Sequence, residues 1–194
     1  MRLAQTALDQ LFLHARTANG FRDEAVPLPV LREVYELARM GPTSLNTQPA
    51  RYLFLTTAQA KERLLPMLSA GNVEKTQSAP VTVVVATDTR FYEHMPQIWH
   101  QAGARERMAA DHEGAQAGAQ RNTSLSAAYF MLAARALGLD CGPMGGFDGE
   151  RLNAEFFPDG RYRVSLLINL GYADADRLRA RNPRLDFEQA CAVL

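Results

Sequence analysis

The chain has 194 residues, 47% of them hydrophobic, which is enough to bury a sizeable core in one compact domain. Lys plus Arg and Asp plus Glu each number 21, and this balance argues against a general nucleic-acid binder or an electrostatic membrane binder. No run reaches the ~20 apolar residues of a transmembrane helix. The N-terminus lacks the apolar core of a signal peptide, and two cysteines are too few for a disulfide framework, so we expect a cytoplasmic protein.

Apolar periodicity predicts two helices at the start of the chain, over residues 3–16 and 29–40. The expected buried positions are Leu3, Leu8, Leu11 and Phe12 in the first helix, and Leu31, Val34, Tyr35 and Leu37 in the second. A strand is expected around 51–56 and a short helix over 58–68. The β-branched run Val81 to Ala86 is the most strand-like stretch, so we predict that it is a central strand.

The second half of the chain begins with residues 89–114, which we interpret as a mobile insertion with short helices. One long Ala-rich helix is predicted over 116–138, ended by Gly138, because glycine commonly ends helices. A strand over 163–172 and a short helix near 186–193 complete the list. No linker or repeat interrupts the pattern, so residues 1–194 are predicted to form one α+β domain.

The loop between Pro42 and Pro49 carries four short polar side chains on a backbone that two prolines keep out of helix. These are Thr43, Ser44, Asn46 and Gln48. Their mixture of donors and acceptors suits a planar heterocycle with alternating carbonyls and ring nitrogens. Taken alone, the loop is better interpreted as a polar connection whose side chains cap local backbone.

Three further segments offer groups for binding. Arg16–Phe21 contains a guanidinium suited to phosphate, although, taken alone, Arg16 is better interpreted as the cap of a helix C-terminus. Gly138–Phe147 is rich in glycines that let backbone N–H groups approach a flat ligand, or it is a strand-edge turn. It lacks the Gly-x-Gly-x-x-Gly spacing and we expect no strand–loop–helix there, which disfavours a Rossmann NAD domain. The tail Arg177–Arg184 is either a solvated surface or a segment that closes over phosphate.

The sequence gives little support for a metal site or for a serine nucleophile. His94, His100 and His112 have no metal-ligand spacing with cysteines or carboxylates, so no metal site is expected. Ser44 lacks the Gly-x-Ser-x-Gly elbow of serine hydrolases. No side chain is identified as catalytic.

Four motifs, in order, resemble the nitroreductase family of FMN-dependent NAD(P)H oxidoreductases. Arg16–Phe21 resembles the family's opening Arg-Ser-x-Arg/Lys-x-Phe element, and Pro42–Pro49 its Pro-Ser-x-x-Asn-x-Gln-Pro loop. Ala136–Gly146 is similar to its Ala-Leu-Gly-Leu segment with a Pro/Met/Gly-rich turn, and 166–171 with 184–188 to its last strand and terminal element. Within the family, Ser69–Asn72 and several of the same motifs look most similar to malonic semialdehyde reductases of pyrimidine degradation.

The resemblance implies a three-layer α+β fold with a central mixed β-sheet flanked by helices, assembled as an intertwined homodimer with FMN at the subunit interface. It implies ping-pong hydride transfer from NADH or NADPH through flavin N5 to a small carbonyl, nitro or quinone substrate. The residues that it assigns to FMN are Arg16, Thr17, Asn19, Thr43, Ser44, Asn46, Gln48, Pro143, Met144, Gly145, Gly146, and Arg181 or Arg184. A backbone N–H in the glycine turn would face N5, and the arginines would hold the phosphate.

Asn19 departs from many members, which carry Arg or Lys near the flavin pyrimidine. Because Asn supplies no charge to the anionic reduced flavin, we expect a lower potential than in those relatives. The leading interpretation is an FMN oxidoreductase that reduces malonic semialdehyde to 3-hydroxypropanoate, and a generalist reductase of nitroaromatics, quinones or enones is the alternative. A non-catalytic binding module that has lost its flavin is the alternative from another class. No motif separates NADH from NADPH.

Overall fold

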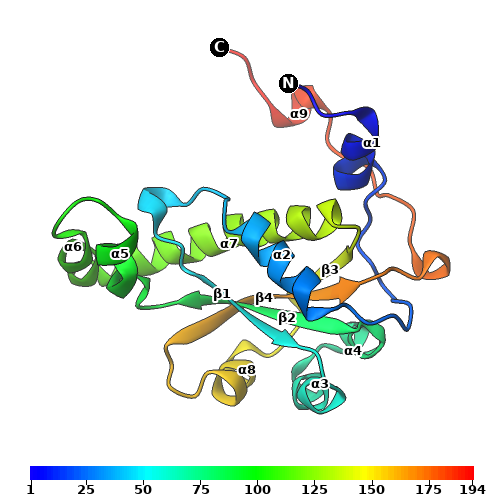
Figure 1. Ribbon diagram of the computed structural model, residues 1–194, viewed down its shortest axis with the longest axis horizontal. Coiled ribbons are helices and arrows are strands. Elements are labelled where there is room, and N and C mark those ends of the chain that lie inside the picture. The colour runs from blue at the N-terminus through cyan, green and yellow to red at the C-terminus, as the bar shows by residue number, and fades with distance from the viewer.

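The computed structural model describes residues 1–194, and its centre is a four-stranded sheet in the order β1-β2-β4-β3 (Figure 1). The strands are β1 (Ala50–Leu55), β2 (Val81–Asp88), β3 (Asp140–Met144) and β4 (Tyr162–Gly171). Every residue of β2 is buried, and the strand pairs with β1 on one side and β4 on the other. The prediction of a central strand at Val81 to Ala86 is therefore confirmed, as its β-branched composition requires.

The expected mixed sheet is wrong for this chain. All three strand pairings are antiparallel, and the single parallel contact is an isolated bridge between Thr17 and Cys141. The connections from β1 to β2 and from β3 to β4 each return the chain antiparallel along a neighbouring strand, whereas β3 is separated from β2 by β4. The α+β class itself holds.

Two helices cover the upper face of the sheet in Figure 1, α2 (Leu28–Ala38) and the long α7 (His112–Ala136). A cluster of 15 buried residues lies between them and the strands, with Phe130 fully buried at its centre and stacked on Tyr52 of β1. The Asp111 side chain begins α7 by accepting a hydrogen bond from the Gly114 N–H. Gly138 follows the helix with φ of 81°, so it ends α7 as predicted.

The opposite face carries α3 (Ala58–Leu64), α4 (Ala70–Ser78) and α8 (Gly149–Phe156), which completes three layers. A second cluster of nine buried residues packs there, around Leu64, Leu152 and Leu167. The sequence predicted α3 but neither α4 nor α8, because both are short and polar. Since α8 follows β3 through a turn, the expectation of no strand–loop–helix after the glycines was wrong. The antiparallel sheet still excludes a Rossmann domain.

Residues 89–114 form short helices, as predicted, at one end of α7. They are a 3₁₀ turn over Phe91–His94, α5 (Met95–Ile98) and α6 (Ala104–Ala110). Arg51 and Arg161 pair with the fully buried carboxylate of Asp88, where this segment begins, and Arg161 also pairs with Glu93. The mobility of the insertion stays a prediction.

The two ends of the chain project together from the body (Figure 1). The N-terminal part is α1 (Gln5–Leu8) with a π-helical turn over Asp9–Leu13, and the C-terminal part ends in α9 (Phe187–Ala190). None of these elements buries a residue. The predicted buried stripe was therefore wrong within one chain, since Leu3 is 55% and Phe12 49% exposed. Tyr35 and Leu37 of α2 are also exposed, whereas Leu31 and Val34 are buried as predicted.

Candidate functional site

The glycine turn after β3 presents two unused backbone donors. The N–H groups of Gly145 and Gly146 donate no hydrogen bond within the chain. The carbonyl of Gly146 is fixed instead, because it accepts from the Ser69 N–H at 3.0 Å and from Nδ2 of Asn72 at 2.7 Å. Gly145 is exposed, and a Cβ added to it would meet no atom within 4 Å. This arrangement holds adjacent N–H groups ready for an external acceptor.

The opening motif lies beside β3, the strand that leads to this turn. Thr17 bridges to Cys141 of β3, and the Ala18 N–H donates to the Cys141 carbonyl at 3.0 Å. A Cβ on Gly142 would lie 2.6 Å from the Ala18 carbonyl oxygen, so only glycine permits this close approach. Asn19 is half-buried, and its Nδ2 donates to the Thr17 carbonyl at 3.2 Å. The fold therefore brings Thr17 and Asn19 next to the strand that leads to Pro143, Met144, Gly145 and Gly146.

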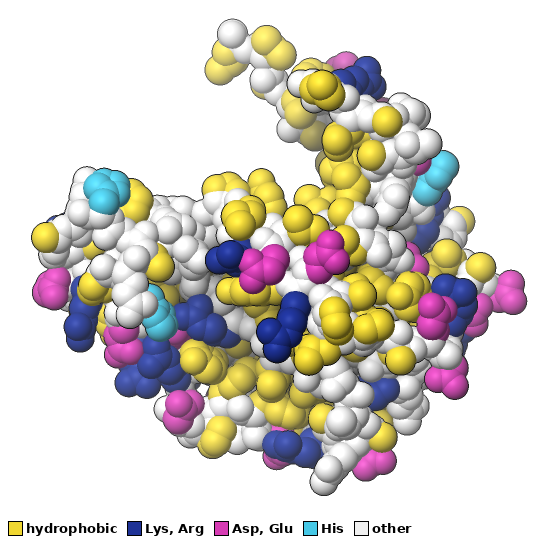
Figure 2. All heavy atoms as spheres, in the orientation of Figure 1, with side chains coloured by type: hydrophobic (Ala, Val, Ile, Leu, Met, Phe, Trp, Pro, Cys, Tyr) yellow, Lys and Arg dark blue, Asp and Glu magenta, His cyan; other side chains and the backbone are white.

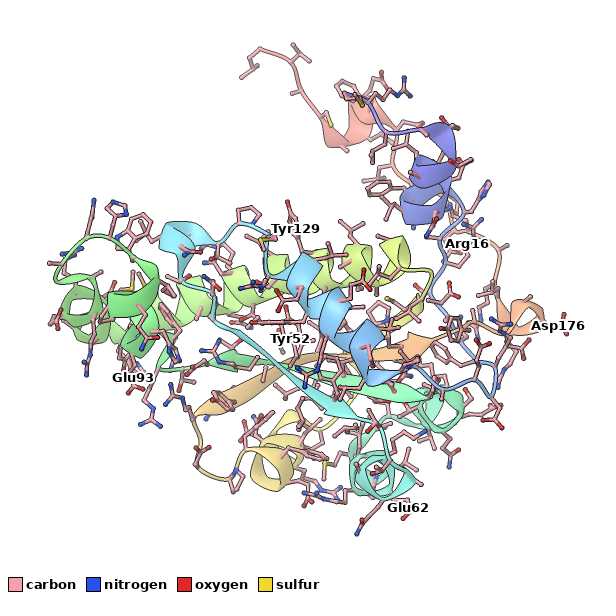
Figure 3. All side chains as sticks on the ribbon, viewed as in Figure 1. Arg16, Tyr52, Glu62, Glu93, Tyr129 and Asp176 are labelled. Carbon is pink, nitrogen blue, oxygen red and sulfur yellow. The ribbon has the colours of Figure 1, made fainter.

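Four arginines gather without a carboxylate where the projecting ends meet the body (Figure 3 labels Arg16). Nη1 of Arg16 donates to the carbonyls of Leu13, His14 and Ala15, and Nη2 of Arg181 donates to those of Phe12, Leu13 and Ala15. Desolvation, followed by the charges of Arg16, Arg184 and Arg135, lowers the pKa of Arg181. None of the four forms an ion pair. In a chain with equal numbers of acids and bases, such a cluster is suited to an external anion.

The structure distinguishes the two tail arginines that the sequence left open. Arg181 lies with Arg16 on the carbonyls that end the N-terminal π-helical turn. Arg184 donates only to the carbonyls of its neighbours Asn182 and Pro183.

Helix α4 supplies residues that the sequence analysis did not assign to the site. Asn72 holds the glycine turn, and Thr76 donates to Sδ of Met144 at 3.8 Å. Lys75, one turn on from Asn72, has its pKa lowered by burial and by the charge of Arg179. Two cations facing one another indicate a second place that favours negative charge. The signal available in the sequence was Ser69–Asn72, which carried the resemblance but was not interpreted as a helix start.

The polar loop of the second motif is held in a strained conformation. Leu45, Asn46 and Gln48 have φ of 51°, 55° and 42°, values that non-glycine residues rarely adopt. Oδ1 of the buried Asn122 accepts from the Ser44 N–H at 2.8 Å, and Oγ1 of Thr43 accepts from the Gln48 N–H at 3.1 Å. Such strain persists only where the surroundings over-determine it, and it is typical of ligand-binding loops.

The amides of this loop contact one another and the insertion. Nδ2 of Asn46 donates to the Ile98 carbonyl at 2.9 Å, and Nε2 of Gln48 donates to Oδ1 of Asn46 at 2.9 Å. The loop starts at Gly41 against the Tyr129 ring, far along α7 from Arg16 (Figure 3). One chain therefore places Arg16, Thr17, Asn19 and Arg181 around the start of β3, the strand that leads to the glycine turn. Thr43, Ser44, Asn46 and Gln48 lie at a separate place.

A cavity of about 650 Å³ follows the glycine turn, where β3 ends and β4 continues without a partner strand on that side. It lies between α7 and α8. Its lining includes Phe147, His112, Gln116, Gln120, Asn153 and Arg163. No helix of the protein combines the length and apolarity needed to cross a membrane.

Comparison with known proteins supplies the family. A family model described as the nitroreductase family matches residues 14–172. A Ralstonia nicotianae protein, named as a candidate NADH dehydrogenase/NAD(P)H nitroreductase, is 50% identical over 99% of this chain and 98% of its own length. A Leptothrix cholodnii protein with the same description is 51% identical over 97% and 96% of the two chains.

Solved structures agree. The fold matches a nitroreductase from Bacillus subtilis with a TM-score of 0.84 and 25% identity, over 98% of this chain and all of that one. It also matches, with a TM-score of 0.82 and 20% identity, an Exiguobacterium sibiricum protein solved in complex with FMN, over 100% and 99% of the two chains. The chain belongs to the nitroreductase family.

Proposed function

We propose that the protein is an FMN-dependent NAD(P)H oxidoreductase that reduces malonic semialdehyde to 3-hydroxypropanoate. The observation that carries the flavin part is the pair of unused N–H groups at Gly145 and Gly146, in a fold that also holds an unpaired arginine cluster next to the segment bonded to β3. A flat ring with acceptor atoms and an attached phosphate matches that pairing of donors. The complex of the Exiguobacterium sibiricum protein with FMN supports the choice of flavin.

Each group has a task in holding the cofactor. Arg16 and Arg181 bind the phosphate, with the Thr17 hydroxyl beside them, and the N–H groups of Gly145 and Gly146 bind acceptors at the ring edge. The chemistry that FMN would supply there is hydride transfer through N5 from NADH or NADPH to a second substrate, in a ping-pong sequence. The protein's task is to hold the ring in one orientation relative to the nicotinamide. The first hydride transfer needs no side-chain acid or base.

We also propose a homodimer in which the second subunit completes the site. The loop that carries Asn46 and Gln48 lies far from Arg16 within one chain, so both sets reach one flavin only if the loop comes from a partner. Apolar side chains gather over α2 and the projecting ends, as Figure 2 shows. The exposed members include Leu3, Phe12, Leu28, Leu37, Met40 and Phe187. An exposed apolar surface of this kind is typical of subunit interfaces.

The substrate test compares acceptors. With reduced enzyme, we expect turnover of malonic semialdehyde at a kcat/KM at least comparable to that of a simple quinone. Turnover of the quinone alone would contradict the aldehyde assignment and favour the generalist reductase. The names of the relatives, which refer to nitroreductase activity, are the observation that favours this second candidate.

A further inference from the structure

Arg177 stands where the C-terminal tail leaves the body of the protein. It closes a 3₁₀ turn over Ala175–Arg177, and its guanidinium pairs with Glu74 of α4. Its side chain also lies across Gly20, because a Cβ added at Gly20 would come 2.6 Å from Nε of Arg177. Gly20 therefore leaves the space that Arg177 fills.

The same corner is tied by backbone hydrogen bonds. The Asp174 N–H donates to the Gly20 carbonyl at 3.1 Å, and the Arg177 N–H donates to the Asp174 carbonyl at 3.1 Å. Phe21 and Ala173 form an isolated bridge just before it. Beyond Arg177, residues 178–194 are all exposed. The contacts around Arg177 therefore fix the direction in which the tail leaves the body, and few contacts hold the tail beyond that point.

Arg181 comes four residues later and is the only tail side chain that bonds to the N-terminal segment, through the carbonyls of Phe12, Leu13 and Ala15. The charge of Arg177 is already balanced by Glu74, whereas Arg181 has no acidic partner. These two arginines therefore have different tasks, although the sequence presents them as one basic run.

We propose that Arg177, seated between Gly20 and Glu74, is a positioning residue that sets the path of the tail and so places Arg181 beside Arg16 for phosphate binding. The inference rests on the proposed function, because it assumes that Arg16 and Arg181 bind the FMN phosphate. Arg177 itself does not contact the phosphate. Its removal should therefore weaken the binding of ligands that carry phosphate and leave the ring site intact.

The test compares the dissociation constants of FMN and riboflavin, which share the ring and ribityl chain but differ in the phosphate. For the wild type we expect FMN to bind much more tightly. Arg177→Gln and Gly20→Ala should each weaken FMN binding by about five- to tenfold and change riboflavin binding less than about twofold. Riboflavin binding also reports that each variant has folded.

Two further variants sharpen the comparison. Glu74→Gln should weaken FMN binding in the same direction, and the Glu74→Gln/Arg177→Gln double variant should be no worse than Arg177→Gln alone, because both remove one interaction. Arg63→Gln breaks a different partly exposed ion pair, with Glu155 on the outer layer, and should change the binding of neither FMN nor riboflavin.

The outcomes separate this inference from the proposed function. If Arg181→Gln loses the preference for FMN but Arg177→Gln and Gly20→Ala keep it, the positioning role is overturned and the phosphate site stands. Equal weakening of both ligands by Arg177→Gln would also overturn it, since the effect would then be a general loss of structure. A wild type that binds riboflavin as tightly as FMN would overturn both.

Discussion

Glycines that look alike in the run from Gly142 to Gly146 have different tasks. Gly142 allows the backbone of Ala18 to approach β3, and Gly146 leaves room for Asn72 and Ser69. Gly145 faces open space. A glycine-rich segment in a sequence therefore indicates close contact, but only the structure tells which contact each residue permits.

We predict that Gly146→Ala weakens FMN binding by about tenfold or more, while Gly145→Ala has little effect. A Cβ at Gly146 would lie 2.7 Å from Nδ2 of Asn72 and 3.0 Å from Oγ of Ser69, so the turn must move. A shift of this kind costs about 1–3 kcal/mol. Fluorescence titration of FMN measures the effect, with Gly145→Ala as the matched control. Equal affinity in the two variants would contradict the assigned role of the turn.

Asn19 allows a prediction about the flavin potential. We expect Asn19→Lys to raise the midpoint potential of the bound flavin by about 10–20 mV, because an exposed charge contributes up to about 1 kcal/mol to the anionic reduced form. Spectroelectrochemistry compares Asn19→Lys with Asn19→Gln, which adds no charge. An unchanged or lower potential in Asn19→Lys would place Asn19 away from the ring.

The sequence predicted only those site residues that lie within the recognised motifs. Thr17 and Asn19 lie beside β3, the strand that leads to the glycine turn, and their role in binding FMN stays a prediction. Asn72 and Lys75 were not assigned, because their meaning depends on a helix whose short, polar sequence gives no periodic signal. The tasks of Arg177 and Arg181 depend on contacts more than 90 residues away along the chain, which spacing alone does not reveal.

At the scale of elements, the sequence predicted β1, β2, β4, α2 and α7, but it missed β3, which lies in the glycine-rich segment that was interpreted as a loop or turn. The partners of the apolar faces were predicted less well. The apolar stripe of the first helix is real, but nothing in the same chain buries it. Periodicity shows that a helix has an apolar face and does not show what covers it. The antiparallel pairing likewise depends on how the chain returns between strands, which no local pattern encodes.

The layer between β1, β3 and the upper helices gives a prediction about alkaline stability. Burial raises the pKa of the Cys141 thiol from 9.0 to about 12, and burial with the neighbouring Tyr35 raises the pKa of Tyr52. Because these folded-state pKa values exceed the unfolded ones, the unfolded state releases protons first as pH rises. The contribution of these two groups to the free energy of unfolding is therefore fully present below about pH 9. It decreases as the pH rises towards 12, by up to about 1.4 kcal/mol per pH unit for each group.

Urea unfolding at several pH values between 8 and 11 measures this slope. Tyr52→Phe keeps the ring stacked on Phe130 but removes one titrating group, so its stability should fall less steeply than that of the wild type. Cys191→Ala, at an exposed cysteine, is the control and should match the wild type. A Tyr52→Phe slope equal to that of the wild type would contradict the account.

At the scale of the whole molecule, a single chain leaves large apolar side chains exposed to solvent. Its two ends extend away from the body, side by side, and leave Phe12 and Phe187 largely exposed (Figures 1 and 2). Burial of apolar area on this scale is what a second subunit would supply.

We predict that the protein sediments as a dimer of the 21.5 kDa chain at micromolar concentration. Phe12→Glu should weaken dimerisation at least about tenfold, because a charge would be buried in an apolar contact. Gln59→Glu, on the exposed surface of α3, adds the same charge and should leave the dimer intact. A monomeric wild type would contradict the shared site.

The most direct test of the central claim is the visible absorption spectrum of the purified protein with FMN, before and after anaerobic addition of NADH or NADPH. We predict a bound-flavin spectrum that bleaches with at least one of the two donors, and the donor that acts faster identifies the preferred nucleotide. A protein that takes up no FMN, or whose bound flavin neither donor reduces, would contradict the claim.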